Sequence, residues 1–538
     1  MSKIPISNIR EHTTLLTTAG PQILSYLSST NLSSARGINR GFREAVGSLR
    51  VYDTQTVVRG SVELWRRSFP NARAINLTGR VLTDADFVHL RGLTDICLSE
   101  TSGFTDAGFA NIAGVKKLSL FRCTAPLTDA ALAHITGIEF LNMSYTSFPL
   151  TDAGLAHLRG IKELIMPQSS IRSQAVFTDA GLAHLVGIRK LDIDGYSSAT
   201  LTDAAFEPLC AKIRGEYPLR ELDIGRCRQF TERVCKSFRK IKKLSINCLE
   251  FTEAALEPLE SIHTLDIGLC SRITSLSHLR GRVKDLNMRF CSRIPGAELV
   301  HLRGIESLDL SYCHDFGDED LSHLVGIKKL LLSNCTQPTL THAAFAPLAR
   351  SLKVLDISWC RHGEIGDRAF AHFGGLEELN MAVCNGPEYT DACLGMIPRV
   401  KKLNVDGCYQ LTPLAIQNLA RTNAVIEEIN FGHPGNMWTL WQGTIRHRDF
   451  VEEGQRLLAS RAAQRRSPAA AAAAAPLVSA AAAAPPPNAW PRGPPSGGAG
   501  GGLWPRGPPS GGAGGGSWPR GPPRERRSRK LKKASKKN

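Results

Sequence analysis

A short apolar motif, Leu-x-Leu or a close variant, recurs sixteen times through the middle of this chain. The motifs are mostly 21 to 27 residues apart, and the one conspicuously long step, 31 residues from Leu191 to Leu222, contains an insertion at 210–219. A unit this short cannot bury its own apolar strand, so the period predicts one array in which each unit covers the next. The motifs begin at Ile75, Ile96, Leu118, Leu141, Leu164, Leu191, Leu222, Leu244, Leu265, Leu286, Leu308, Leu330, Leu355, Leu379, Leu403 and Ile429.

In many of these repeats a cysteine follows the first strand residue by five positions, as in LDIGRC, LDLSYC and LDISWC. This spacing resembles the cysteine-containing subclass of leucine-rich repeats, in which a cysteine or asparagine stands where the chain leaves the strand and turns inward. A small side chain with a weak hydrogen-bond donor suits that crowded position. The predicted fold is therefore an α/β leucine-rich-repeat solenoid, a horseshoe of about 16 strand-helix repeats over residues 75–431. The cysteines are Cys123, Cys227, Cys270, Cys291, Cys313, Cys335, Cys360, Cys384 and Cys408.

The second half of each repeat predicts a short helix. It reads Thr-Asp-Ala-Gly-Leu-Ala-His-Leu, followed by a glycine, at 151–160 and again at 178–187. Thr151 can cap the amides of the first turn, Asp152 can complement the positive end of the helix, and Gly160 can end it. We therefore expect strands on the concave side of the array and helices on the convex side.

Charge and cysteine content restrict the classes of function. The formal charge is +17, but residues 461–538 hold fifteen Arg or Lys and one acid, so this end contributes +14 and the rest only +3. One cysteine per repeat is explained by packing without disulfides, which favours a reducing, cytoplasmic and/or nuclear location. The first 25 residues lack an apolar signal core and no segment is apolar enough to span a bilayer, so we expect no membrane partner.

The segment before the array carries a second motif. Residues 23–46 read ILSYLSSTNLSSARGINRGFREAV, with apolar residues spaced for short amphipathic helices. The segment resembles an F-box in ILSYL, in Leu32 after a polar turn, and in Ile38 followed by Arg40 and Phe42. It departs from that family at Leu15-Leu16, where a Leu-Pro pair is usual.

An F-box followed by cysteine-containing leucine-rich repeats resembles the receptor subunits of SCF-type cullin-RING ubiquitin ligases. The resemblance implies a non-catalytic protein with no cofactor. Its F-box would dock on a Skp-type adaptor and so reach a cullin, and its solenoid would capture the target for ubiquitin transfer by a separate enzyme. The adaptor-binding residues carried over are Leu15, Ile23, Leu24, Leu27, Leu32, Ile38 and Phe42.

Candidate partner-binding residues lie on the predicted concave face. Acidic and amide residues stand between the strand leucines of many repeats, and three of the repeat cysteines follow a large aromatic residue. Exposed aromatic residues on adjacent repeats either anchor an interface or pack on each other along the rim, and both interpretations stay open. The acidic row disfavours nucleic acid on this face. The candidates are Asp223, Asp266, Arg289, Phe290, Asp309, Tyr312, Asp356 and Trp359.

The chain contains no CxxC pair, no nucleotide-binding loop and no recognisable catalytic constellation. We therefore predict that it is not an enzyme and carries no cofactor and no metal.

The segments around the array have different compositions. We predict an F-box-like helical segment at 1–50, an N-terminal cap or linker at 51–74, a C-terminal cap and helix at 432–466, and a disordered tail at 467–538. Basic clusters of this density favour a nuclear import signal, and nucleic-acid binding through the tail is a less favoured alternative. The nuclear-signal candidates are Arg526, Arg527, Arg529, Lys530, Lys532 and Lys533.

Two other functions compete with the ligase receptor. In the first, the protein is an interaction scaffold whose N-terminal helices, with Trp65 and Phe69, only cap the open apolar end of the first repeat. In the second, it is a nuclear RNA-binding protein acting through residues 485–538.

Overall fold

The computed structural model describes residues 49–167, 176–196, 198–247, 250–360, 365–431 and 443–446. The chain divides into two units between Arg466 and Ser467, and all described residues belong to the first unit. Residues 1–48 and the predicted tail, 467–538, therefore lie outside the described residues, as does most of the predicted C-terminal cap.

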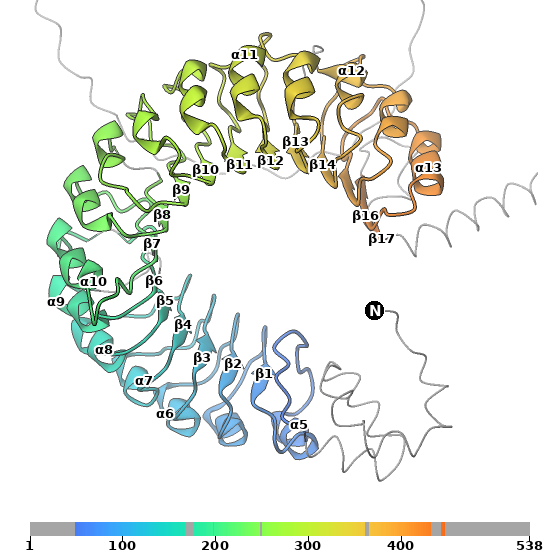
Figure 1. The fold of residues 1–538 in the computed structure, drawn as a ribbon. Helices are drawn as coiled ribbons and strands as arrows, with labels where there is room; N and C mark the ends of the chain where they lie inside the picture. The colour runs from blue at the N-terminus through green and yellow to red at the C-terminus, as the bar shows by residue number, and fades with distance from the viewer. Residues whose placement is uncertain are drawn as a thin grey trace, which may run out of the picture. The chain divides into compact units, whose positions relative to one another are not determined.

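The described residues form sixteen parallel strands in one sheet, and each strand pairs with the next one along the chain. The strands are in register at the first motif residue, so that Leu286 lies between Leu265 and Leu308. A final strand, β17, runs antiparallel to β16. The predicted leucine-rich-repeat solenoid is thus confirmed (Figure 1). The strands are β1 Ala74–Asn76, β2 Asp95–Cys97, β3 Lys117–Ser119, β4 Phe140–Asn142, β5 Glu163–Ile165, β6 Lys190–Asp192, β7 Glu221–Asp223, β8 Lys243–Ser245, β9 Thr264–Asp266, β10 Asp285–Asn287, β11 Ser307–Asp309, β12 Lys329–Leu331, β13 Val354–Asp356, β14 Glu378–Asn380, β15 Lys402–Asn404, β16 Glu428–Phe431 and β17 Gly443–Arg446.

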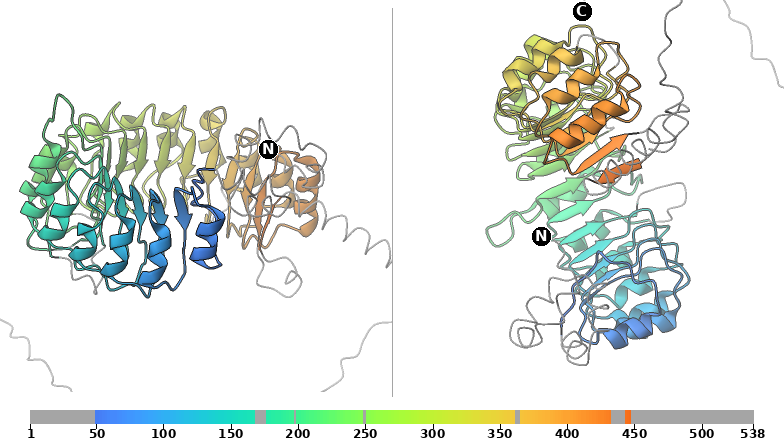
Figure 2. Two further views of the ribbon diagram at one scale, coloured as in Figure 1. Left: turned by 90° about the horizontal axis from the view of Figure 1, so that it is seen from below. Right: turned by 90° about the vertical axis from the view of Figure 1, so that its right-hand side faces the viewer.

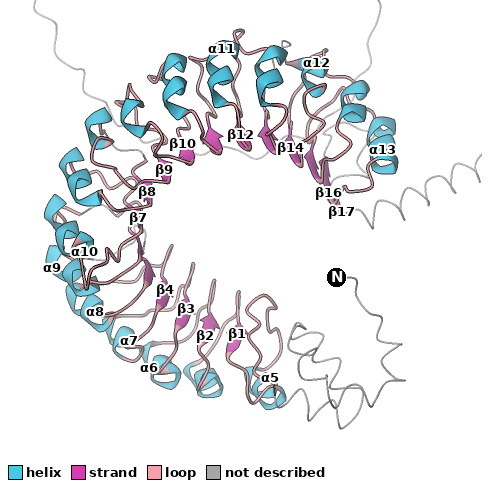
Figure 3. Cartoon of the chain, viewed as in Figure 1, coloured by secondary structure: helices cyan, strands magenta, loops and turns pink. Residues whose placement is uncertain are grey.

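Short helices cover the outer side of the curved array and the strands line its inner side, as Figure 3 shows by colour. Most helices are one or two turns long, and many are 3₁₀ helices, labelled η. They are α5 Val62–Ser68, η2 Asp84–Leu90, α6 Asp106–Phe109, η3 Ala110–Ile112, α7 Asp129–Ala133, α8 Asp152–His157, α9 Asp179–Leu182, η4 Ala183–Leu185, η5 Asp203–Phe206, α10 Glu207–Cys210, η6 Glu232–Phe238, η7 Glu253–Ala255, η8 Ser277–Leu279, η9 Gly296–Leu302, α11 Asp318–Leu321, η10 Ser322–Leu324, η11 His342–Leu348, α12 Gly366–Phe370, η12 Asp391–Met396 and α13 Pro413–Thr422.

One continuous apolar core lies between the strands and the helices. Both strand leucines of a repeat and the apolar residues of its helix are buried, as Leu308, Leu310 and Leu321 illustrate. At the start of the array, helix α5 contributes Trp65 and Phe69, which are both buried with ring centroids 5.8 Å apart. This pair closes the apolar layer of the first repeat.

A threonine and an acidic residue join successive helices by a two-point clamp. Thr178 donates its backbone N–H to Oδ1 of Asp152 at 2.7 Å and its hydroxyl to Oδ2 at 2.8 Å. The Thr178 hydroxyl also accepts from the N–H of Ala180 at 3.2 Å, which caps α9. The sequence predicts the cap, whereas the second role of the carboxylate, as the acceptor for the next repeat, follows only from the structure. The clamps are Asp84–Thr105, Asp106–Thr128, Asp129–Thr151, Asp152–Thr178, Asp179–Thr202, Asp203–Thr231, Glu232–Thr252, Asp318–Thr341, Asp367–Thr390 and Asp391–Thr412.

The clamp explains the glycine of the helix motif. A Cβ added at Gly154 would lie 2.1 Å from Oδ1 of Asp129, and one added at Gly181 would lie 2.1 Å from Oδ1 of Asp152. Glycine at these positions leaves room for the carboxylate of the preceding repeat.

The cysteines form a second ladder between repeats. The thiol of Cys335 donates to the carbonyl oxygen of Leu310 in the preceding repeat at 3.3 Å, and eight such bonds span 2.9 to 3.3 Å. Every described cysteine is a free thiol, which confirms that the ladder needs no disulfide. Burial raises the pKa of Cys313 to about 11 and that of Cys360 to about 12, so both thiols keep their proton at neutral pH.

Asp152→Ala tests the clamp. The substitution leaves the N–H and the hydroxyl of Thr178 without their acceptor, and losing hydrogen bonds to a charged group costs about 1.5–3 kcal/mol. We expect local stability around α8 and α9 to fall by about 2 kcal/mol, measured by native-state hydrogen exchange. Glu207→Ala, which removes an exposed first-turn carboxylate outside the clamps, is the control. Equal exchange in the two variants would contradict the assignment.

Candidate functional site: the inner face of the array

The inner face carries one side chain from between the two strand leucines of each repeat. In ten of the described repeats this residue is Asp or Asn whose Oδ1 accepts the backbone N–H two residues later at 2.8 to 3.2 Å. Such Asx turns direct the chain out of the strand. Four predicted site residues, Asp223, Asp266, Asp309 and Asp356, therefore hold their own turns. Asn287, Asn380 and Asn404 do the same in other repeats, so the turn does not require a negative charge.

Burial disfavours the charge on part of this row. It raises the pKa of Asp223 to about 6, and the neighbouring Asp192 and Asp194 act in the same direction. The pKa values of Asp192 and Asp266 are raised for the same main reason, desolvation. Asp192 lies directly opposite Asp223 across β6 and β7, and Arg226 forms an ion pair with Asp194 beside them.

The residue four positions after the first motif residue, such as Phe290 after Leu286, has a left-handed backbone. Its φ is positive in repeat after repeat, for example 61° at Phe290 and Tyr312 and 62° at Trp359. Its N–H donates to the next repeat, as from Phe290 to the carbonyl of Ser311 at 3.0 Å. This conformation continues the backbone ladder past the end of the strand. The non-glycine residues of the row are Glu100, Arg122, Tyr145, Arg226, Leu269, Phe290, Tyr312, Asn334, Trp359 and Val383, and the glycines are Gly79, Gly195 and Gly407.

Five residues of this row form what we call the apolar ridge: Leu269, Phe290, Tyr312, Trp359 and Val383. They belong to the turns after β9, β10, β11, β13 and β14, and Asn334 stands at the equivalent place in the turn after β12. The strands β9 to β14 are neighbours in the sheet that lines the array (Figure 2). Leu269 is 51% exposed, Phe290 38% and Trp359 44%. The structure thus places three of the predicted aromatic site residues on one ridge.

Two of these rings are stacked. Phe290 and Tyr312 lie with ring centroids 4.1 Å apart and planes 23° apart. The guanidinium of Arg289 lies 5.2 Å from the Phe290 centroid and 4.9 Å from the Tyr312 centroid. The rings therefore pack on each other, as one interpretation of the sequence expects, while Phe290 still exposes more than a third of its surface. The interface role stays a prediction.

A second cluster of the same composition was not predicted. Phe121 and Tyr145 meet edge to face at 5.5 Å, and the guanidinium of Arg122 lies 5.1 Å from the Phe121 centroid and 5.6 Å from the Tyr145 centroid. The predicted aromatic residues each precede a repeat cysteine, whereas Thr146 replaces that cysteine after Tyr145. The position of Tyr145, four residues after the strand residue Leu141, is the signal that identifies it. Leu269 and Val383 do precede repeat cysteines, but they are not aromatic.

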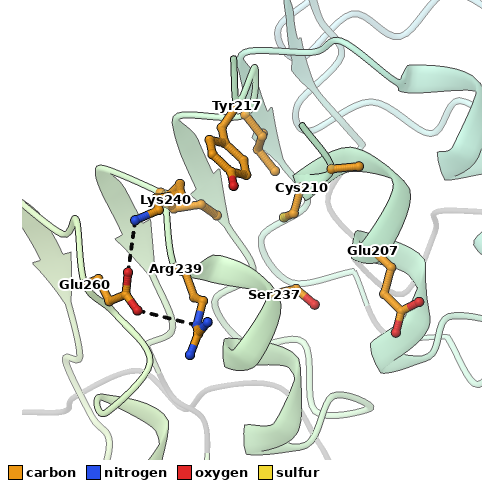
Figure 4. A pocket seen from close by; sticks show the side chains of 10 residues that line it. Glu207, Cys210, Tyr217, Ser237, Arg239, Lys240 and Glu260 are labelled. Carbon is orange, nitrogen blue, oxygen red and sulfur yellow. Dashed lines mark hydrogen bonds and ion pairs between the residues drawn. The ribbon is translucent and has the colours of Figure 1, made fainter. Parts of the chain in front are cut away.

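The insertion in the long repeat lines a cavity of about 390 Å³ (Figure 4). The labelled side chains include Cys210 and Tyr217, and also Glu260, which forms ion pairs with Lys240 at 3.0 Å and Arg239 at 3.6 Å. Burial raises the pKa of Cys210 to about 12, so this thiol supplies no thiolate at neutral pH. Cys210 is therefore not an activated nucleophile.

Several predicted site residues lie outside the described residues. These are the seven adaptor-binding candidates, Leu15, Ile23, Leu24, Leu27, Leu32, Ile38 and Phe42, and the six nuclear-signal candidates between Arg526 and Lys533. Within the described ranges, no group of three or more His, Cys, Asp or Glu side chains is arranged to hold a metal ion. None of the helices described is long and apolar enough to cross a membrane.

Many solved structures have a similar fold, and two of them illustrate the likeness. The first is the crystal structure of a TLR13–ssRNA13 complex, at 16% identity and a TM-score of 0.42, covering 74% of this chain. The match covers 62% of that chain, so this protein spans less than two thirds of its length. The second is the crystal structure of the Rad7 and Elc1 complex in yeast, at 15% identity and a TM-score of 0.39, covering 77% of this chain and 96% of that one. These values are too low to transfer a partner from either structure.

No protein-family model and no curated protein matches the chain.

Asp223→Asn tests the buried charge on the inner face. An aspartate in an unfolded chain titrates near 3.9, whereas Asp223 in the folded chain has a pKa of about 6. Because the folded state holds this proton more tightly, ionisation of Asp223 opposes folding. The cost is absent below about pH 4, grows between about pH 4 and 6, and is fully present above about pH 6.

Asparagine removes the charge and keeps the acceptor for the N–H of Gly225. We expect the variant to exceed the wild type in free energy of unfolding by on the order of 1–3 kcal/mol at neutral pH, and to match it near pH 4. Urea unfolding at the two pH values measures this. Asp223→Ala, which loses the acceptor, is the control, and equal stability of wild type and Asp223→Asn at neutral pH would contradict the assignment.

Proposed function

We propose that this chain is a non-catalytic receptor that captures a protein partner on the inner face of its leucine-rich repeats. The observation that carries the proposal is the apolar ridge, where Leu269, Phe290 and Trp359 stay exposed and Tyr312 and Val383 are half-buried. Exposed aromatic residues clustered at the centre of a surface are the residue type that dominates protein interfaces.

The backbone at the ridge strengthens this proposal. A left-handed conformation costs an L-residue about 1–2 kcal/mol relative to glycine. Glycine occupies the same position at Gly79, Gly195 and Gly407, so the turn itself does not need a side chain. Leu269 and Trp359 therefore occupy positions where glycine would suit the backbone better, and a binding role accounts for their presence.

The proposal extends to an SCF-type cullin-RING ubiquitin ligase. The F-box-like segment, residues 1–50, would bind a Skp-type adaptor, and the ridge would hold the target. Support comes from the order of motif residues from Ile23 to Phe42 and from their place directly before the array. The free thiols of the repeats suit the reducing cytoplasm or nucleus in which such a ligase would work.

The alternative is an interaction scaffold without a ligase partner, in which the N-terminal helices only cap the array. Helix α5 bears on this alternative, because Trp65 and Phe69 already cover the first repeat. Both functions use this cap, so they differ only in whether the F-box-like segment also binds an adaptor.

Charge substitution in the F-box-like segment tests the ligase role. We expect Leu27→Asp with Phe42→Asp to reduce co-purification of the full chain with a Skp-type adaptor and a cullin at least about tenfold, because adaptor docking buries apolar helix faces. Val325→Asp, on an exposed residue of the outer side, and Phe290→Ala, on the ridge, should leave adaptor binding unchanged.

Circular dichroism of each variant establishes that the repeats remain folded. Undiminished adaptor binding by the folded double variant would contradict the ligase role. Failure of the wild-type chain to bind any adaptor would favour the scaffold.

A further inference from the structure

The apolar ridge has a row of carboxylates beside it. Asp266, Asp309 and Asp356 each stand three residues before a ridge residue, on β9, β11 and β13. Each uses one oxygen for its Asx turn, at 2.8 Å in all three cases. The second oxygen of Asp356 accepts from the side-chain amide of Asn380 at 2.8 Å, which leaves its charge without a cation. Among the described residues, none of the three is part of an ion pair. This part of the inner face therefore combines exposed apolar side chains with negative charge that has no cationic partner in the array.

The charge is not explained by the turn. Asn287 and Asn380 make the same turn without a charge on β10 and β14. Half-burial also raises the pKa of Asp266, so its ionised form is held at a cost. Carboxylates kept beside an apolar ridge, where asparagine would serve the turn, complement a cationic partner.

The spacing of the row restricts the partner's conformation. Neighbouring strands lie about 4.8 Å apart, so carboxylates on every second strand lie roughly 9.6 Å apart. A polyproline II segment repeats every three residues, or about 9.3 Å. An extended β-strand repeats a face every two residues, about 6.7 Å, and falls out of phase with the row.

The arrangement of side chains around a polyproline II segment also matches this part of the inner face. With three residues per turn it presents three rows of side chains, so cations can point to the carboxylates while an adjacent row lies against the ridge. Proline rings pack well on aromatic residues such as the exposed Phe290 and Trp359 and the half-buried Tyr312. The stacked pair of Phe290 and Tyr312, with Arg289 over both rings, gives this row a fixed platform.

We propose that the inner face from β9 to β14 binds an extended, polyproline II segment of a partner protein that presents arginine or lysine at every third residue. The cations of this segment pair with Asp266, Asp309 and Asp356, and its apolar face covers the ridge. The inference rests on the proposed receptor function and names the chemistry of the captured segment.

The test uses the full chain and a fluorescent (Arg-Pro-Pro)₄ peptide, with (Glu-Pro-Pro)₄ as the charge-reversed probe. Fluorescence anisotropy at moderate ionic strength gives the Kd. We expect binding of the arginine peptide and at least about tenfold weaker binding of the glutamate peptide. Equal binding of the two peptides, or no binding of the arginine peptide, would overturn the proposal.

Variants of the chain then test where on the array the peptide binds. Asp309→Asn with Asp356→Asn keeps both turn acceptors and removes two charges, and we expect the Kd to rise about tenfold or more. Trp359→Ala should also weaken binding, through the loss of apolar contact. Asp192→Asn is the matched control, because this carboxylate makes the same turn on β6 and is followed by Gly195 instead of a ridge residue. A Kd for Asp192→Asn raised as much as for the double variant would mean diffuse charge attraction and would overturn the proposal.

The outcome is separable from that of the proposed function. If the arginine peptide fails to bind while cellular partners still co-purify with the wild type and are lost from Phe290→Ala, the receptor function stands and the partner chemistry is wrong. If both fail, the ridge is not a binding surface.

Discussion

The array depends on hydrogen bonds that each repeat makes with its neighbours and cannot make alone. Four such ladders cross every typical interface: the paired strands, the N–H of the left-handed turn residue, the cysteine thiol, and the clamp between threonine and acid. Together they run from the inner face to the helices. Stability therefore accumulates from contacts between nearest neighbours, as is usual for solenoid proteins.

These ladders decide which positions are left for function. The strand leucines fill the core, the cysteine lies inside the turn, and the Asp or Asn between the leucines holds the chain direction. The left-handed residue contributes only its backbone to the ladder, so its side chain can vary. The row accordingly contains Gly195, Arg226, Leu269 and Trp359 at equivalent places. Over β9 to β14, large apolar residues occupy most of these left-handed positions although glycine would suit the backbone better. This choice of residues distinguishes the ridge from the framework.

The sequence predicts the framework well because its signals are local. Leu308 and Leu310 mark a strand within three residues, and Thr178 caps a helix that starts at the next residue. The cysteine ladder was also predictable, since a cysteine recurs five residues after the first strand leucine, as Cys335 does after Leu330. The clamp was not, because Asp152 and Thr178 are 26 residues apart and their contact depends on how the two repeats stack.

The site was predictable only in part. Phe290, Tyr312 and Trp359 stand out by residue type, but their left-handed backbone and the stacking of Phe290 on Tyr312 depend on the turn geometry. Asp309 and Asp356 were interpreted from sequence as partner-binding residues alone, and the structure adds that they shape their own turns. Asparagine makes the same turn at equivalent positions, so the turn does not require the negative charge.

The account holds that ridge side chains serve binding and are not needed for the fold. Leu269→Gly tests this most directly, because Leu269 is 51% exposed, has a φ of 62° and takes part in no aromatic stack. Glycine removes the cost of the left-handed backbone, so the free energy of unfolding should stay equal or rise by about 1 kcal/mol, and Leu269→Ala should be less stable than Leu269→Gly. A loss of about 2 kcal/mol or more in Leu269→Gly would show that the ridge is part of the framework and would contradict the account.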